Sequence, residues 1–289
     1  MTALPAFDTV DGARPDARPT VGALLRDWRQ RRRLSQLDLA LEADISTRHL
    51  SFVETGRASP SRDMILHLAE RLDVPLRERN ALLVAAGFAP MYDERPLHDP
   101  AMACATRAIE LVLAGHEPFP ALAVDRHWTM ITANRAVAPL LAGCAPELLR
   151  PPVNVLRLSL HPQGLAPRIA NHAQWRDHLL ERLRRQWQVS ADPVIAALLD
   201  ELSAYPAPPA AAAPAADGDV RAAGHPAVAI PMQLVNGDEL LSFYSTTTVF
   251  GTPIDVTLSE LAIEAFFPAD RSTTDALNRM ARLWRAAQQ

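Results

Sequence analysis

The stretch SQLDLALEADISTRHLSFVETGR, residues 35–57, decides the fold of the N-terminal third of the chain. Its apolar residues recur at helical spacing in two groups, which are Leu37, Ala40 and Leu41, then Leu50 and Val53. Residues 43–45 break the pattern, and Ser46 follows as the expected N-cap of a second helix. The small side chain of Ala40 would let the two helices cross closely. The stretch therefore predicts two short helices joined by a tight turn.

Two such helices form a helix-turn-helix, in which the second helix enters the major groove of DNA. Its outward side would carry Thr47, Arg48, His49, Ser51 and Phe52. We expect Arg48 to bond O6 and N7 of a guanine, or else a phosphate. His49 and Ser51 can each donate a hydrogen bond to a base or a phosphate. Phe52 would either touch a thymine methyl group or pack on a partner helix.

Three residues at the ends of these helices complete the predicted DNA contacts. Gln36 starts the first helix, where its amide would bond a phosphate beside the helix N-terminus or serve only to begin the helix. Ser46 lies at the start of the second helix. Arg57 follows Gly56, which suits a left-handed C-cap, and it is placed to meet a phosphate. Glu54 is expected to pair with an arginine rather than to touch DNA.

Further helices are predicted on both sides of this stretch. Thr20 and Ser61 are the expected N-caps of two of them. The flanking helices are predicted over residues 21–33, 62–72 and 75–87. Residues 1–19 lack periodicity and predict a flexible arm. Residues 20–90 thus predict one compact all-α domain of five short helices.

Residues 91–289 combine helical stretches with alternating ones and predict an α+β domain. About five strands in two groups are expected, within residues 120–134, 229–235, 239–250 and 259–268. Pro231 indicates an edge strand, and Asn236-Gly237 indicates a hairpin turn. Asn134 is expected to cap a short helix. The Ala/Pro-rich residues 206–226 predict a flexible insert.

The net charge of −4 is unevenly distributed along the chain. Residues 20–90 hold 11 arginines against 9 acidic residues, whereas residues 91–289 hold 16 against 21. Every strongly basic side chain is arginine, which suits bidentate phosphate and guanine contacts. The N-terminal part is therefore the better candidate for binding DNA, and the acidic remainder is not expected to touch phosphate.

Cysteine usage and hydropathy predict a cytoplasmic protein. Cys104 and Cys144 give no disulfide framework, and they indicate reduced thiols. The N-terminus has no basic segment followed by an apolar run, so no signal peptide is expected. No apolar run reaches about 18 residues, so neither a membrane span nor a membrane partner is expected.

The C-terminal part lacks the motifs of an enzyme. It has no G-x-S-x-G motif, no phosphate-binding glycine loop and no i, i+4 histidine pair, so we expect no catalysis, no metal site and no resident cofactor. His172 and His178 are expected to be surface residues. Its strands instead offer side chains that would line a pocket for a small fatty-acid-like or aromatic effector, or that would form an ordinary core. These candidates are Trp128, Met130, Met232, Phe243, Tyr244, Ile263 and Phe267.

The N-terminal domain resembles the Cro/C1-type (XRE) helix-turn-helix family. The resemblance rests on Ser35-Gln36, Leu39-Ala40, Ile45-Ser46, Leu50, Glu54 and Gly56-Arg57. The remainder resembles the MmyB-like ligand-binding domain, a PAS-like module found behind such domains. That similarity is sharpest over residues 121–137 and 249–270. The resemblance implies a lambda-repressor-like fold for the first part, and for the second a PAS-like antiparallel sheet with flanking helices.

The leading hypothesis is a transcription regulator that binds a double-stranded DNA operator as a homodimer, because one short helix per copy reads few bases. The C-terminal domain, from residue 91, would dimerise and sense a small apolar ligand. The alternative is a ligand-independent regulator whose C-terminal domain is only a dimerisation or protein-interaction module. An enzyme with a vestigial helix-turn-helix is the third hypothesis, and the missing catalytic motifs speak against it.

Overall fold

The computed structural model describes residues 19–208 and 230–286 of the chain. The predicted arm, apart from residue 19, and most of the predicted insert lie outside the described residues. Contacts divide the chain between Tyr92 and Asp93 into two compact units.

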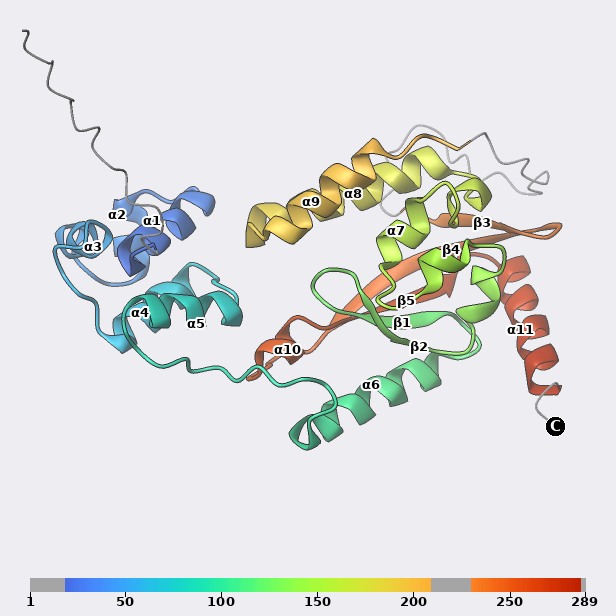
Figure 1. Cartoon of the computed structure of the whole chain (residues 1–289), viewed down its shortest axis with the longest axis horizontal. Helices are drawn as coiled ribbons and strands as arrows, with labels where there is room; N and C mark the ends of the chain where they lie inside the picture. Colours follow the sequence, from blue (N-terminus) through green and yellow to red (C-terminus); the bar gives the residue numbers. More distant parts are fainter. Residues whose placement is uncertain (1–18, 209–229, 287–289) are drawn as a thin grey trace, which may run out of the picture. The chain divides into compact units, whose positions relative to one another are not determined.

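The described residues of the N-terminal unit form an all-α domain of five helices, as predicted (Figure 1). The helices are α1 (Val21–Arg31), α2 (Gln36–Glu42), α3 (Thr47–Glu54), α4 (Arg62–Arg71) and α5 (Leu76–Ala85). The predicted caps Thr20, Ser46 and Ser61 each accept a backbone N–H three residues further on. Ser35 and Asp38 form a reciprocal capping box at the start of α2. The sequence therefore sets the starts of four helices by side-chain caps.

The inner face of α2 differs from the predicted one. Leu37 and Leu41 are 55% and 71% exposed, whereas Leu39, Ala40 and Ala43 are buried. Leucines occupy both candidate faces of this seven-residue helix, so helical spacing alone could not choose between them. The buried face is the one that carries the small residues, which allow α2 to cross α3 closely. The packing of the two helices therefore determines which face is buried.

The C-terminal unit contains a five-stranded antiparallel sheet in the order β2-β1-β5-β4-β3. Its strands are β1 (Ala121–Val124), β2 (Met130–Ala133), β3 (Met232–Asn236), β4 (Glu239–Val249) and β5 (Ala262–Pro268). The prediction of an α+β domain with two strand groups is confirmed. β3, which follows Pro231, lies at an edge, and Gly237 turns the β3–β4 hairpin with φ +62°.

Helices cover both faces of this sheet (Figure 1). On one side α6 (Ala103–His116) packs on β1 and β5 through a small cluster that includes Ile109, Leu113 and Ile263. The larger core lies on the opposite side, under α7 (Val155–Leu160), α8 (His172–Ser190) and α9 (Pro193–Ala204). The remaining helices are α10 (Val256–Ser259) and α11 (Arg271–Ala286), and α11 packs on β4.

Asn134 is a buried cross-link and not the predicted helix cap. Its Oδ1 accepts from the Ala121 N–H at 3.1 Å, and its Nδ2 donates to the carbonyls of Leu113 and Phe119. The amide thus ties the end of β2 to β1 and α6. The residues after it form a turn and a 3₁₀ helix, Ala138–Leu141, rather than an α-helix.

His172 and His178 are half-buried on α8 rather than fully on the surface. Burial, followed by the nearby charges of Arg182 and Arg185, lowers the pKa of His178 below its ordinary value. Among the helices of the described residues, none combines the length with the apolar composition that a membrane span requires.

Candidate DNA-binding helix and ligand cavity

Helix α3 is fixed to its unit on one side and carries polar groups on the other. Leu50 and Val53 are almost completely buried and anchor it. Arg48 is exposed, and its guanidinium lies 5.3 Å from the centre of the Phe52 ring on the next turn. This cation–π contact holds the Arg48 guanidinium against its own helix. The half-buried Thr47, His49, Ser51 and Phe52 surround it.

A buried ion pair joins α3 to α1. Arg29 Nε lies 2.6 Å from Glu54 Oε1, and Arg29 Nη2 lies 2.9 Å from Oε2. Gln36 Nε2 also donates to Glu54 Oε2, at 2.7 Å. Burial opposes the ionisation of Glu54, but these bonds and the charges of Arg29 and Arg26 outweigh it and lower the pKa of that carboxyl. Glu54 therefore acts as a structural partner of an arginine, as the sequence suggested.

The Gln36 contact adds a detail that the sequence could not supply. One N–H of its amide nitrogen is donated to Glu54, so the second N–H is the donor that could meet a phosphate. Arg57 is exposed beyond Gly56, which has φ +71°. The predicted DNA contacts of Gln36, Ser46, Arg57 and the α3 residues stay predictions, and all lie on α2, on α3 or at their ends.

The C-terminal unit contains a partly open cavity of about 90 Å³ between the sheet and helices α7 and α8. Its walls are almost entirely apolar, and all five strands of the sheet contribute lining residues. Leucines from the covering elements line its other side, among them Leu140, Leu156, Leu158, Leu165 and Leu179. A concave, apolar site of this kind is what a small apolar molecule requires.

The structure divides the seven predicted ligand residues into two groups. Trp128, Met130, Met232 and Phe243 line the cavity. Tyr244, Ile263 and Phe267 do not. Tyr244 and Phe267 are 39% and 43% exposed, and Ile263 packs in the α6 cluster. Successive residues of a strand point to opposite faces, so Phe243 and Tyr244 could not both face one cavity.

Sequence reasoning missed the cavity residues on the other face of β5, Glu264 and Phe266. Both faces of this strand are covered, so its alternation could not reveal which face holds the cavity. Arg182 was also missed, because it lies on a helix 82 residues before its partner Glu264. Only the alternation of Glu264 with apolar neighbours signalled a buried charge in β5.

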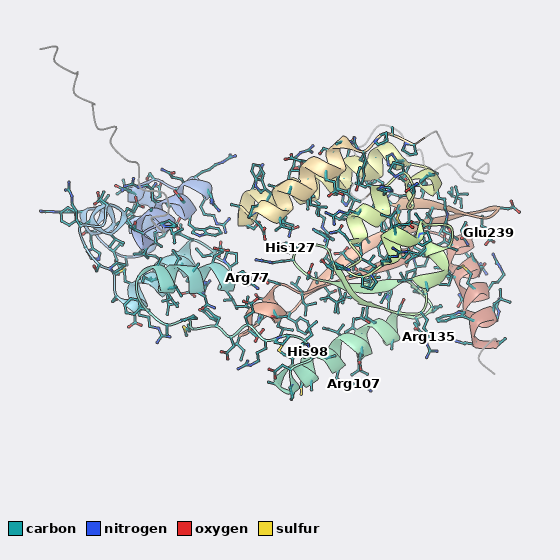
Figure 2. The ribbon with its side chains drawn as sticks, in the orientation of Figure 1. Arg77, His98, Arg107, His127, Arg135 and Glu239 are labelled. Atoms are coloured by element: carbon teal, nitrogen blue, oxygen red, sulfur yellow. The ribbon has the colours of Figure 1, made fainter. Side chains whose placement is uncertain are left out.

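Trp128 has an unusual backbone conformation at the edge of the cavity. Its φ is +67°, a left-handed value that bulky residues rarely adopt. Its indole Nε1 donates to Gln186 Oε1 at 2.8 Å, and Gln186 Nε2 donates to the Arg126 carbonyl at 2.6 Å. The adjacent His127, visible in Figure 2, has its Nε2 2.8 Å from Asp192 Oδ2. The β1–β2 turn is thus tied to both α8 and α9.

Together the two units define a DNA-binding module followed by an effector-binding type of domain. Residues 25–79 match the helix-turn-helix family model, and residues 105–280 match the model of the MmyB-like transcription regulator ligand binding domain. The chain belongs to this MmyB-like family, because the second match covers more than half of it. No curated protein matches the chain.

The protein is therefore a DNA-binding transcription regulator, since both matched modules are those of such regulators. Among the residues described, no group of three or more His, Cys, Asp or Glu side chains is arranged to hold a metal ion.

Proposed function

We propose that the protein binds a pseudo-palindromic operator as a homodimer, and that a small apolar ligand in the cavity changes its affinity for that operator. The observation that carries this proposal is the apolar cavity, which lies in the domain that follows the DNA-binding unit. We place the protein in the cytoplasm, where an operator is accessible.

Dimerisation follows from how little one α3 helix can read. Its outward side chains reach only a few base edges, so one copy would discriminate weakly. Two copies on half-sites about 34 Å apart would multiply the discrimination. The C-terminal unit would set the spacing between the copies.

Ligand control requires different affinities of the ligand for two arrangements of the dimer. A ligand that bound both arrangements equally would not change operator affinity. By reciprocity, operator DNA would change ligand affinity by the same factor.

The reading helix is tested by Arg48→Ala. Gel shifts on a selected operator should show the loss of sequence-specific binding, while non-specific binding to random DNA persists. Arg107→Ala is the matched control, because Arg107 is an exposed arginine of α6 that pairs with Glu110 at 3.2 Å (Figure 2). Specific binding with unchanged base preference in the Arg48 variant would refute the assignment of α3 as the reading helix.

Dimerisation and ligand binding are tested separately. Sedimentation of the full chain should give a dimer, and insertion of about half a helical turn of DNA between the half-sites should weaken binding. Native mass spectrometry of protein purified from cells should show a reproducible small-molecule adduct. A persistent absence of adduct, with no thermal shift across fatty acids and aromatic compounds, would favour a ligand-independent dimerisation module.

A further inference from the structure

The second half of β4 has one edge that no described strand covers. β3 pairs with β4 only as far as Met232, which lies opposite Phe243. On its other side β4 continues to pair with β5 until Val249 lies opposite Ala262. Within residues 19–208 and 230–286, residues 244–249 are therefore paired on one side alone.

The pairing pattern shows which backbone groups face the open side. Along an antiparallel ladder, residues alternate between those that bond with the opposite strand and those that turn away from it. The Phe266 N–H donates to the Pro120 carbonyl at 2.9 Å, so Phe266 does not bond with Ser245 opposite it. By alternation, Ser245, Thr247 and Val249 turn their N–H and C=O groups toward the open side. None of these groups forms a backbone hydrogen bond outside its strand with any other described residue.

The other edges of the sheet are short or partly covered. β2 has four residues, and the Met130 N–H at its edge donates to the Val153 carbonyl at 2.7 Å. β3 follows Pro231, and its Leu234 forms a bridge with Ile169. Natural sheets protect exposed edges with charges, prolines, bulges or short strands, because an uncovered edge pairs readily with another chain. The open half of β4 has the sequence YSTTTV, which contains no charged residue and no proline.

The side chains along this edge are exposed and suited to strand pairing. All three threonines are exposed, and Val249 is 62% exposed. Threonine and valine favour strands, and the segment is already extended, so little ordering is needed when another strand binds. Tyr244 and, opposite it on β5, Phe267 add exposed rings beside the edge. Such an edge is suited to the addition of another strand.

A second copy of the same strand fits this edge without a conflict of charge. Antiparallel pairing about a two-fold axis at Thr247 places Ser245 of each copy opposite Val249 of the other. The outward residues would then exchange about six backbone hydrogen bonds. Thr246 would lie opposite Thr248, and threonine pairs across strands are favourable. Because residues 244–249 carry no charge, the two copies meet there without like-charge repulsion.

We propose that the open edge of β4 is the homodimer interface of the C-terminal unit, where two copies join their sheets into one continuous antiparallel sheet. This inference rests on the proposed function, which requires a dimer, and it names the surface that forms it. The pairing defines one two-fold axis, so it holds the two C-terminal units in one arrangement. Ser245 also lines the cavity, which places the interface next to the proposed effector.

The test exchanges the paired threonines for charges in the full-length protein. One variant carries Thr246→Lys with Thr248→Lys, and the other carries Thr246→Glu with Thr248→Glu. Sedimentation should show that the dissociation constant of the dimer rises at least tenfold in each variant, because like charges then lie opposite each other. An equimolar mixture of the two variants should recover dimers, because opposite charges then meet. Thr132→Lys, at an exposed position of β2, is the matched control and should leave the dissociation constant unchanged.

Hydrogen exchange locates the contact independently of these variants. The amides of Ser245, Thr247 and Val249 should exchange at least fivefold more slowly in dimeric than in monomeric native protein. The lysine variant should lose this protection at the same concentration. Circular dichroism verifies that each variant is folded.

The outcomes separate this interface from the proposed function. A dimer whose dissociation constant is unchanged in both folded charge variants would overturn the β4 interface and leave dimerisation standing. Failure of the mixture to recover dimers would overturn the antiparallel pairing. Protection of the same amides in monomeric protein would mean that the edge is covered within one chain, which also overturns the proposal. A native protein that stays monomeric, both free and on operator DNA, would refute the dimer of the proposed function as well.

Discussion

Arg29 of α1 and Glu54 of α3 face each other as a two-point ion pair, with N···O distances of 2.6 and 2.9 Å. The Glu54 side chain is completely buried, and that of Arg29 is 10% exposed. Arg29 Nη1 also donates to the Leu34 carbonyl at 2.8 Å, just before α2 begins. This one arginine therefore connects three helices of the DNA-binding unit and sets how α3 is presented.

Removal of one partner of this pair should destabilise the unit strongly. Glu54→Ala leaves the Arg29 charge buried without compensation, and the expected cost is about 3–5 kcal/mol. Hydrogen exchange of the α1 and α3 amides, followed by mass spectrometry, reports this free energy for the N-terminal unit alone. The double variant Arg29→Met with Glu54→Met should lose less stability than the sum of the losses of Arg29→Met and Glu54→Met measured singly. Glu42→Gln, at an exposed position of α2, is the control and should leave this free energy unchanged. Additive losses in the double-mutant cycle would contradict the coupling between Arg29 and Glu54.

Acid should weaken the same unit through Glu54. Its pKa in the folded protein is lowered, so the ionised carboxylate stabilises the fold above its unfolded pKa of about 4.3. This contribution is lost as the pH falls through the still lower folded pKa. Thermal melts between pH 7 and pH 3 should therefore show steep acid destabilisation in the native protein. Glu54→Gln should be less stable at pH 7 but should have a flatter acid profile, and parallel profiles would exclude this role of Glu54.

The local features of the fold could be predicted from the sequence because they depend on neighbouring residues. Side-chain caps such as Ser46 and the Asn236-Gly237 turn act within a few residues. The alternation of β3 and β5 and the Thr and aromatic content of β4 indicated strands. The choice of face could not be predicted in the same way. In α2, Leu37 and Leu39 compete for the core, and only the crossing with α3 decides between them.

The residues that line the cavity were equally hard to predict from local sequence patterns. Phe243 lines the cavity, but Ile263 lies on the opposite face of the sheet, which α6 covers. The Arg182–Glu264 pair is formed between a helix and a strand that are far apart in the sequence. No periodicity within either element encodes such a contact, so its discovery required the tertiary structure.

Gly22 in α1 should tolerate no side chain. A Cβ atom there would lie 2.3 Å from the Val53 carbonyl oxygen and 2.9 Å from that of Glu54. Because backbone must move to make room, Gly22→Ala should destabilise the N-terminal unit by about 1–3 kcal/mol, and it should shift α3. Hydrogen exchange of the N-terminal unit measures the loss.

Gly115→Ala is the matched control for this substitution. Gly115 also lies in a helix, α6, but a Cβ atom there would meet nothing within 4 Å. Alanine should therefore stabilise α6 by roughly 0.5–1 kcal/mol, because it restricts the unfolded chain and favours the helix. Equal effects of the two substitutions would mean that the close approach of α1 to α3 does not control the Gly22 position.

Arg168 should be needed for the shape of the cavity although it does not line it. Its guanidinium donates to the carbonyls of Leu140, Ala142 and Val235, at 2.8–3.0 Å, and to Asn236 Oδ1 at 3.1 Å. Leu140 is a cavity residue, so these bonds connect the cavity wall to β3. Charge-assisted bonds of this kind contribute about 1.5–3 kcal/mol each where they are buried, and part of this set is exposed to solvent.

Arg168→Met should therefore cost about 2–3 kcal/mol and loosen two segments that are remote in sequence. Hydrogen exchange should accelerate in residues 138–142 and in β3, while the α6 amides remain unaffected, since α6 packs on the other face of the sheet. Arg150→Met provides the control, because Arg150 is an exposed arginine after a 3₁₀ helix of the same unit. Uniform acceleration over the whole C-terminal unit would mean that Arg168 supports global stability and does not specifically hold the cavity wall against β3.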